Sequence, residues 1–241
     1  MTGCALRRCS GWSGADVAGP APRALVIGAS GGIGAALVRA LMGDGWHVTG
    51  LSRSQGGFDI TDEAAVIAGL APLSPGFDRL IVATGALALS GTAPEKTLRN
   101  LNPLAMAAQF ATNAIGPALV LKHGLRLVRR DQPALIAALS ARVGSIGDNG
   151  LGGWYSYRAA KAALNQLIHT AAIEIARSHP AAAVVALHPG TVETPLTHGY
   201  RGSHPALSPD QAATHLMAVM ADLTAAETGG FFDWQGTRVP W

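Results

Sequence analysis

The sequence contains little cysteine and few charged residues. Its two cysteines, Cys4 and Cys9, both lie near the N-terminus, so the body of the chain has no disulfide framework and no cysteine-ligated metal. Charged residues make up 14% of the 241 residues, the formal net charge is +3, and the arginines are scattered. This distribution argues against binding to nucleic acid.

Long hydrophobic runs are also missing. No uninterrupted apolar run reaches the roughly 18 residues of a membrane span, and residues 1–22 lack the apolar core of a signal peptide. We therefore expect no membrane insertion and a cytoplasmic location. Residues 1–22 are rich in Gly, Ser, Ala and Pro. We interpret them as a disordered leader, or as residues added because an upstream start codon was chosen in error.

Motifs for metal-dependent or hydrolytic chemistry are not found. The later histidines show no H-x-x-x-H spacing and no nearby cluster of carboxylates, and no serine stands in a G-x-S-x-G motif. We therefore expect no metal site. The histidines considered are His169, His179, His188, His198, His204 and His215.

Short apolar runs alternate with helical patterns from residue 23 onward. Strands are expected at residues 24–28, 47–52, 77–85, 133–140, 182–190 and 229–234, and helices at residues 32–45, 61–71, 103–130, 154–178 and 208–223. This alternation predicts an α/β fold: one Rossmann-type domain over residues 23–241, with a doubly wound parallel sheet covered by helices on both faces.

The second crossover is too short for a helix. Only about half a dozen residues separate the second expected strand from the sequence FDITD at residues 58–62, whereas a helical crossover needs a dozen or more. We expect this crossover to be abbreviated and to lead into a short third strand. The sheet would then have about seven strands.

A glycine pattern joins the first expected strand to the first expected helix. Gly28, Gly32 and Gly34 form G-x-x-x-G-x-G, which permits a sharp turn and a close approach of backbone to ligand. The helix N-terminus that follows favours negative charge, as on a pyrophosphate. The alternative is a tight glycine loop without a ligand.

Two of the three tyrosines lie in the sequence GGWYSYRAAKAALNQ at residues 152–166. Residues four apart share one face of a helix, so Tyr157 is expected near Lys161 while Tyr155 points away. A free phenol has a pKa of about 10, and a nearby ammonium is expected to lower the pKa of Tyr157, as suits a proton donor. The alternative is that both tyrosines are structural, which we favour for Tyr155.

These motifs, in this order, resemble the short-chain dehydrogenase/reductase family. The glycine pattern resembles T-G-x-x-x-G-x-G with Ile27 in place of threonine, and Tyr157 and Lys161 match Y-x-x-x-K. Residues 189–194, PGTVET, match P-G-x-V-x-T, and Asn113 matches the asparagine of the middle helix. From about residue 23 onward, the chain looks closest to the C-factor-like branch, near the sniffer-type carbonyl reductases.

The resemblance implies an oxidoreductase that transfers hydride between a nicotinamide and a small carbonyl or alcohol substrate. Tyr157 would be the general acid or base, and a proton chain would run through Lys161 to a water near Asn113. Asn113 has an alternative role as a helix-kink residue. The rival function is a cofactor-binding signalling or regulatory module in which catalysis is weak or dispensable.

The catalytic serine of the family is altered. The family usually ends its fifth strand with two serines, the second of which orients the carbonyl, but here the pair reads Ser140 and Ala141. We expect Ser140 to take over through a shift in register, with Ser145 or neither serine as the alternatives. The family's N-N-A-G reads VATG at residues 82–85, so only Gly85 is retained.

The second expected strand ends in LSRS, without a carboxylate. A carboxylate there would bind the ribose hydroxyls of NAD, whereas the Arg53 guanidinium suits a 2′-phosphate, so NADP(H) is favoured and NAD(H) is the alternative. Arg53 as a solvated surface residue is the other interpretation. By resemblance, Asp59 would contact the adenine. The complete expected cofactor set is Gly28, Ser30, Gly32, Ile33, Gly34, Arg53, Asp59, Ile60, Gly85, Tyr157, Lys161, Pro189, Gly190, Val192 and Thr194.

Two further expectations concern partners. The helices at residues 103–130 and 154–178 are rich in alanine, which lets helices of two subunits approach closely, and the family commonly pairs these helices. We expect a homodimer or homotetramer. Residues 195–208 are expected to form a loop that closes over the substrate.

Overall fold

The computed structural model describes residues 20–89, 91–200 and 206–241. Most of the expected leader at residues 1–22 and the middle of the expected substrate loop at residues 195–208 lie outside the described residues.

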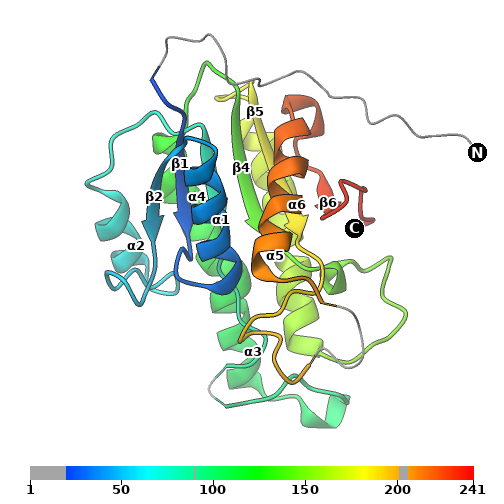
Figure 1. The fold of residues 1–241 in the computed structure, drawn as a ribbon. Helices are drawn as coiled ribbons and strands as arrows, with labels where there is room; N and C mark the ends of the chain where they lie inside the picture. The colour runs from blue at the N-terminus through cyan, green and yellow to red at the C-terminus, as the bar shows by residue number, and fades with distance from the viewer. Residues whose placement is uncertain (1–19, 90, 201–205) are drawn as a thin grey trace, which may run out of the picture.

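One parallel sheet forms the centre of the molecule (Figure 1). Its strands lie in the order β2-β1-β3-β4-β5-β6, and each neighbouring pair is parallel. The order changes direction at β1, so the carboxyl ends of β1 and β3 flank the crevice in which doubly wound proteins bind ligands. The strands are β1 (Arg23–Ile27), β2 (His47–Leu51), β3 (Arg79–Val82), β4 (Ala134–Leu139), β5 (Ala182–His188) and β6 (Phe231–Asp233).

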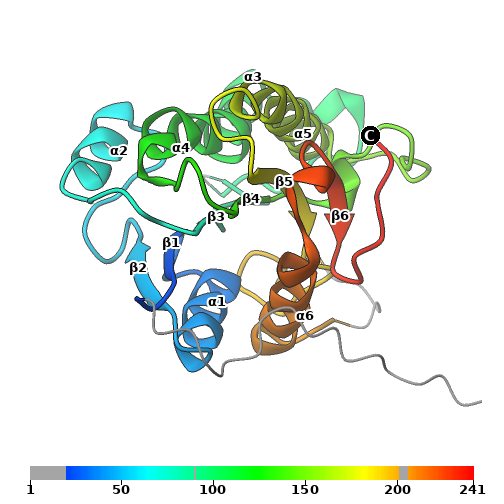
Figure 2. The same cartoon turned by 90° about the horizontal axis from the view of Figure 1, so that it is seen from above.

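Helices cover both faces of the sheet, as expected (Figure 2). One face is covered by α1 (Gly32–Gly43) and α6 (Pro209–Asp222), and the other by α2 (Glu63–Leu70), α4 (Gly116–Gly124) and α5 (Tyr155–Ile175). Helix α3 (Pro103–Phe110) lies beyond the end of the sheet and packs on α5. Because side chains alternate along a strand, Leu25 belongs to one core cluster and Val26 to the other. The sheet is therefore buried on both sides.

The sheet has six strands among the described residues, not the expected seven. The expected third strand at residues 58–62 does not form, because Gly56 and Gly57 turn the chain with φ values of +131° and +70°. Phe58 and Ile60 are instead buried in the core cluster that includes Val66 of α2. The abbreviated crossover thus runs into α2 without adding a strand, and β2 remains at the sheet edge.

The helical stretch expected at residues 103–130 runs from Pro103 to Leu127. The expected interruption near Gly116 is a change in hydrogen bonding, because a π-helical turn (Ala111–Ile115) joins α3 to α4 without a break. Such turns are frequent at functional sites. A Cβ on Gly116 would lie 2.7 Å from Ile60 Cγ1, so this position needs glycine.

By length and composition, the 25-residue stretch Pro103–Leu127 could cross a membrane, with a mean hydropathy of 1.4. In the structure its α4 part packs on the sheet, and Asn113 and Val120 within the stretch are both 0% exposed. Core helices pass the same compositional test, and this stretch is buried only in part, since Leu104 and Ile115 remain exposed.

Candidate active site

The glycine-rich turn joins β1 to α1 at the carboxyl edge of the sheet. Gly28 has a φ of +87°, and its N–H donates to the Leu51 carbonyl over 2.8 Å. A Cβ on Gly34 would collide with the Gly28 carbonyl, and one on Gly32 would lie 2.7 Å from Thr194 Cγ2. The structure thus brings two predicted motifs together, since Thr194 of the P-G-x-V-x-T segment packs directly on the glycine turn.

Unpartnered hydroxyls lie near this turn. Ser52 Oγ, just after β2, and Thr84 Oγ1, just after β3, are buried without a hydrogen-bond partner among the described residues. Leaving a buried hydroxyl unpaired is costly, and this edge is where Rossmann folds bind a dinucleotide. Ser54 Oγ donates to Ser30 Oγ over 2.8 Å beside the exposed Arg53. These residues fit a ribose that carries a phosphate.

Three of the expected cofactor residues make hydrogen bonds or core contacts within the protein. Asp59 accepts the backbone N–H and the hydroxyl of Thr61 over 2.9 and 2.7 Å, and these bonds hold the pKa of Asp59 below its usual value. Ile60 is 7% exposed and contacts Gly116, while Ile33 packs against the core under α1. The Ile60 side chain therefore faces the core.

The P-G-x-V-x-T segment follows β5. Gly190 has a φ of +81° and lies against the Trp234 indole, while Pro189 is buried. Val192 is 2% exposed, and its carbonyl accepts a hydrogen bond from the Thr197 hydroxyl. The segment is therefore held firmly over the carboxyl edge of the sheet.

Tyr157, Lys161, Asn113 and Gly85 converge at the carboxyl ends of β3 and β4. Lys161 Nζ lies 5.9 Å from the centre of the Tyr157 ring. A Cβ on Gly85 would lie 3.3 Å from Asn113 Oδ1 and 3.6 Å from Lys161 Nζ. The predicted proximity of Tyr157 to Lys161 is confirmed, and Tyr155 does not line the pocket described below.

Asn113 is fully buried in the π-helical turn and uses both ends of its amide. Oδ1 accepts the Ala86 N–H over 3.1 Å, and Nδ2 donates to the Ala86 carbonyl over 2.9 Å and to Gln109 Oε1 over 2.6 Å. Because both N–H donors are committed, a water could bind here only at the second lone pair of Oδ1 or at backbone. Asn113 therefore clamps the loop that follows β3.

Burial dominates the protonation of Tyr157 and Lys161. It raises the pKa of the Tyr157 phenol above its usual value and lowers the pKa of Lys161 to about 7. The expectation that Lys161 lowers the pKa of Tyr157 is therefore wrong for the protein without a bound ligand. The physical reason is that desolvation disfavours both charged forms. The Lys161 amine also donates to the Leu139 carbonyl over 2.8 Å.

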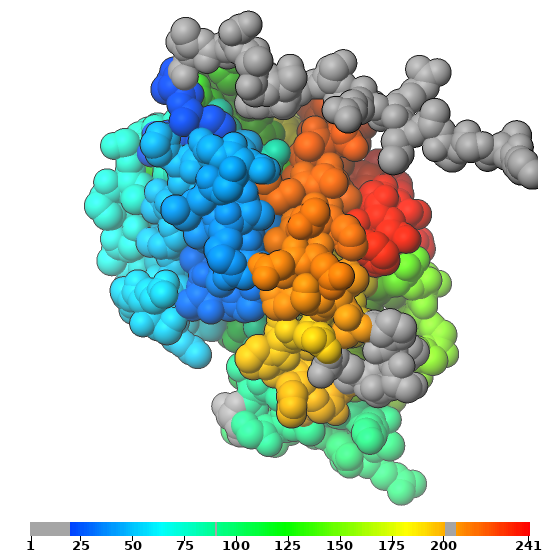
Figure 3. Space-filling model, in the orientation of Figure 1, coloured from blue at the N-terminus to red at the C-terminus, as the bar shows by residue number. Residues whose placement is uncertain are grey.

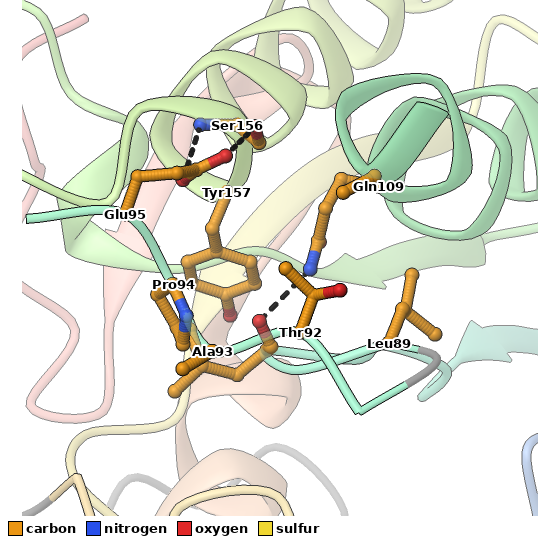
Figure 4. A pocket seen from close by; sticks show the side chains of 10 residues that line it. Leu89, Thr92, Ala93, Pro94, Glu95, Gln109, Ser156 and Tyr157 are labelled. Carbon is orange, nitrogen blue, oxygen red and sulfur yellow. Dashed lines mark hydrogen bonds between the residues drawn. The ribbon is translucent and has the colours of Figure 1, made fainter. Parts of the chain in front are cut away.

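A small pocket lies beside Tyr157, between the loop after β3 and helices α3 and α5. In Figure 4 the Tyr157 ring lies between the Glu95–Ser156 pair and Thr92. Gln109 reaches in from α3 and donates to the Leu87 carbonyl over 2.8 Å. The pocket is lined by Leu87, Leu89, Thr92, Ala93, Pro94, Glu95, Ala105, Gln109, Ser156 and Tyr157.

Neither candidate serine lines this pocket. Ser140 Oγ donates to Asn165 Oδ1 over 2.6 Å in the core, and Ser145 Oγ accepts the Asp148 N–H over 3.1 Å. Since successive side chains leave a strand on opposite sides, Ser140 faces α5 and the next position is Ala141, which has no hydroxyl. These contacts do not support the expectation that Ser140 orients a substrate carbonyl.

Gln109 and Glu95 belong to none of the motifs that the sequence shows. Gln109 could have been found, because it precedes Asn113 by four residues and so shares its helix face. Glu95 could not, since its partner Ser156 is 61 residues away and no local pattern links them.

Comparison with known proteins agrees with this geometry. A family model described as enoyl-(acyl carrier protein) reductase matches residues 51–230. The chain belongs to the short-chain dehydrogenase/reductase family and is an oxidoreductase.

Individual relatives support the expected branch. The 1-hydroxy-2-glutathionyl-2-methyl-3-butene dehydrogenase of Rhodococcus sp. (strain AD45) is 29% identical over 229 residues, which are 90% of this chain and 98% of that protein. C-signal of Myxococcus xanthus is 35% identical over 137 residues, 56% of this chain and 78% of that protein. The predicted resemblance to C-factor-like proteins is confirmed.

Solved structures share the fold. A short-chain dehydrogenase/reductase from Burkholderia multivorans with bound NADP has a TM-score of 0.76 at 28% identity, with 92% of this chain and 100% of that chain covered. The carbonyl reductase Sniffer of D. melanogaster has the same TM-score and coverage at 20% identity. The second likeness shows the shared fold alone.

Replacing Lys161 by methionine tests the effect of burial on its amine. Between the folded pKa of about 7 and the ordinary value of 10.5, the unfolded chain binds more protons. The amine therefore destabilises the fold fully below pH 7 and progressively less toward pH 10.5. We expect Lys161→Met to raise Tm at acidic pH, with the gain shrinking as the pH approaches 10, as measured by thermal unfolding. The exposed Lys96→Met is the control, and a gain that is independent of pH would contradict the assignment.

Proposed function

We propose that this protein is an NADPH-dependent reductase of a small carbonyl compound, with Tyr157 as the proton donor. The observation that carries the proposal is the convergence of Tyr157, Lys161 and Gly85 beside a pocket and next to the glycine-rich turn. The reverse reaction would oxidise the corresponding alcohol.

The protein's own residues divide the work as follows. Reduced nicotinamide, when bound, supplies the hydride that adds to the carbonyl carbon. Tyr157 transfers its phenolic proton to the carbonyl oxygen, and its raised pKa keeps the phenol protonated and ready to donate at neutral pH. Lys161, with a pKa of about 7, can return a proton to Tyr157.

The end of β2 supports a preference for NADP(H). Arg53 is exposed beside the Ser30–Ser54 pair and the unpartnered Ser52 hydroxyl, so a 2′-phosphate would find one guanidinium and several hydroxyls. The related structure from Burkholderia multivorans holds NADP. NAD(H) is the alternative cofactor.

Reversing the charge at position 53 tests this preference. We expect the parent to bind NADPH more tightly than NADH, and Arg53→Asp to invert the order because a carboxylate repels the 2′-phosphate. Dissociation constants from fluorescence titration measure the effect. Arg99→Asp, an exposed arginine remote from the glycine turn in sequence, is the control. Equal affinities of the parent for both cofactors would remove Arg53 from the site.

Replacing the two tyrosines separately tests the proton donor. We expect Tyr157→Phe to lower kcat for aldehyde reduction by about 10²- to 10⁴-fold, because a positioned acid is lost, while NADPH binding stays within a few-fold. Tyr155→Phe is the matched control, since Tyr155 does not line the pocket. Equal losses in both variants would refute the assignment of Tyr157.

A second candidate function is a cofactor-binding signalling module. It is favoured by Ala141, which leaves the usual serine position without a hydroxyl, and by the similarity to C-signal of Myxococcus xanthus. The two candidates differ in turnover: a reductase consumes NADPH with a panel of aldehydes and ketones, whereas the module binds NADPH without turning over.

We also propose that the chain forms a homodimer or homotetramer through its α3–α4 stretch and α5. Large apolar side chains on these helices remain exposed: Leu104 is 83% exposed, Ile115 51%, Leu167 40% and Ile173 56%. Covering them in a subunit interface would remove apolar surface from water. The cytoplasmic location stays a prediction.

Light scattering tests the assembly. At micromolar concentration we expect a mass of two or four chains for the parent and a smaller mass for Ile173→Asp, which places a charge in the proposed interface. Met42→Asp is the control, because Met42 is 62% exposed on α1, on the opposite face of the sheet. A monomeric parent would rule out the proposed assembly.

A further inference from the structure

A buried carboxylate from a distant loop caps the helix that carries Tyr157. Glu95 is 5% exposed, and its Oε2 accepts the Ser156 N–H over 3.2 Å while Oε1 accepts the Ser156 hydroxyl. Ser156 is the second residue of α5, where unpaired N–H groups and the helix dipole favour negative charge. Burial raises the pKa of Glu95, but the hydrogen bonds from Ser156 and from the backbone of Glu95 itself together outweigh it and leave the pKa below its usual value.

The same loop residue fixes an unusual backbone conformation. Trp154, at the N-cap of α5, has φ 51° and ψ 44° and is the only non-glycine residue with positive φ in the described part of the chain. The Trp154 backbone N–H donates to the backbone carbonyl of Glu95 over 2.5 Å. A left-handed conformation is unfavourable for a bulky residue and persists where the surroundings enforce it, often at binding sites.

In this conformation, the Trp154 indole contacts two tyrosines. The ring centres are 6.3 Å from Tyr157 and 6.2 Å from Tyr200, and both pairs meet edge to face. The segment that leads to Tyr200, yellow in Figure 3, lies at the surface below α6. Leu196 of this segment lies 4.0 Å from the Cβ position of Gly85. Three aromatic rings thus connect the proposed proton donor to the segment beside the site.

The polar groups of the adjoining pocket are mostly committed to the protein. Glu95 is bonded to Ser156, and Gln109 bridges the Leu87 carbonyl and Asn113. Neither lysine nor arginine is among the described residues that line the pocket. An anionic substrate would find no counter-ion here and would be repelled by the Glu95 carboxylate, whose two oxygens are already bonded to Ser156.

We infer that Trp154 is a specificity-determining residue that selects uncharged carbonyl compounds bearing a flat aromatic ring, and that Glu95 is the positioning residue that holds it. This inference rests on the proposed reductase function. A substrate ring held beside Tyr157 and the adjoining Trp154 indole gains aromatic contacts with both, whereas a saturated ring with the same carbon skeleton gains burial alone.

A matched pair of substrates tests the role of Trp154. The ratio of kcat/KM for benzaldehyde to that for cyclohexanecarbaldehyde is measured with NADPH in the parent and in Trp154→Gly, where glycine adopts the left-handed conformation without strain. We expect this ratio to fall about 2- to 10-fold through KM, with kcat largely kept. Trp154→Asn, which also tolerates the conformation, provides a second variant. An unchanged ratio in both variants overturns the inference.

Variants of Glu95 test the positioning role. We expect Glu95→Ala to lose the aromatic preference as Trp154→Gly does, because the side-chain bonds to Ser156 hold the backbone carbonyl of residue 95 against the Trp154 N–H. Glu95→Gln should retain the preference, because its amide oxygen still accepts the Ser156 N–H. The exposed Glu174→Ala on α5 is the control and should change neither rate nor ratio. If Glu95→Ala folds and keeps the parent ratio, Glu95 does not position Trp154.

A binding measurement separates this inference from the proposed reaction. Calorimetry compares benzamide with cyclohexanecarboxamide, neither of which is reduced, in the parent and in Trp154→Gly, with and without NADP⁺. We expect the parent to bind benzamide more tightly, by a margin that the variant loses. If this difference is found but no carbonyl is reduced, the proposed reductase function is refuted, whereas the inferred binding of an aromatic ring at Trp154 is supported. If carbonyls are reduced without the difference, the inference alone fails.

Discussion

The hydrogen bond from the Lys161 amine to the Leu139 carbonyl fixes the position of the proposed proton donor. It ties α5 to the carboxyl end of β4, deep in the fold, where Lys161 is 2% exposed. A buried amine without a partner would be costly, so the bond restrains the whole helix relative to the sheet. Tyr157, one turn earlier on α5, is thereby held beside Lys161 at the edge where the glycine turn begins.

The loop after β3 depends on this arrangement and shapes the pocket. Two side chains of the α3–α4 stretch bond its backbone: Asn113 bonds the N–H and carbonyl of Ala86, and Gln109 bonds the Leu87 carbonyl. At the other end of the loop, its own Glu95 side chain bonds Ser156 of α5. Each bond involves a buried polar group, so the loop is restrained at both ends. In the proposed reaction, this restrained loop and the start of α5 would therefore determine which substrates fit the pocket.

The altered serine position changes what the site can offer a carbonyl oxygen. With Ala141 in place of a hydroxyl, Tyr157 and Thr92 bear the hydroxyls that line the pocket apart from Ser156, which is bonded to Glu95. In the proposed reaction, the Tyr157 phenol protonates the oxygen, and only Tyr157 and Thr92 are left to orient it. The raised pKa of Tyr157 is consistent with a group that acts as a donor at neutral pH.

The sequence by itself determined the features that depend on residues close together in the chain. The glycine turn, the order of strands and helices, the caps of α2 at Asp62 and of α6 at Ser208, and the proximity of Tyr157 to Lys161 all follow from local spacing. The tertiary structure decided the features that depend on burial. The expected third strand gave way to packing of Phe58 and Ile60 against the core, and Ser140 turned toward Asn165. The direction of the Tyr157 pKa shift and the bond from Ser156 to Glu95 had the same origin, because desolvation and long-range contacts exist only once distant segments have come together.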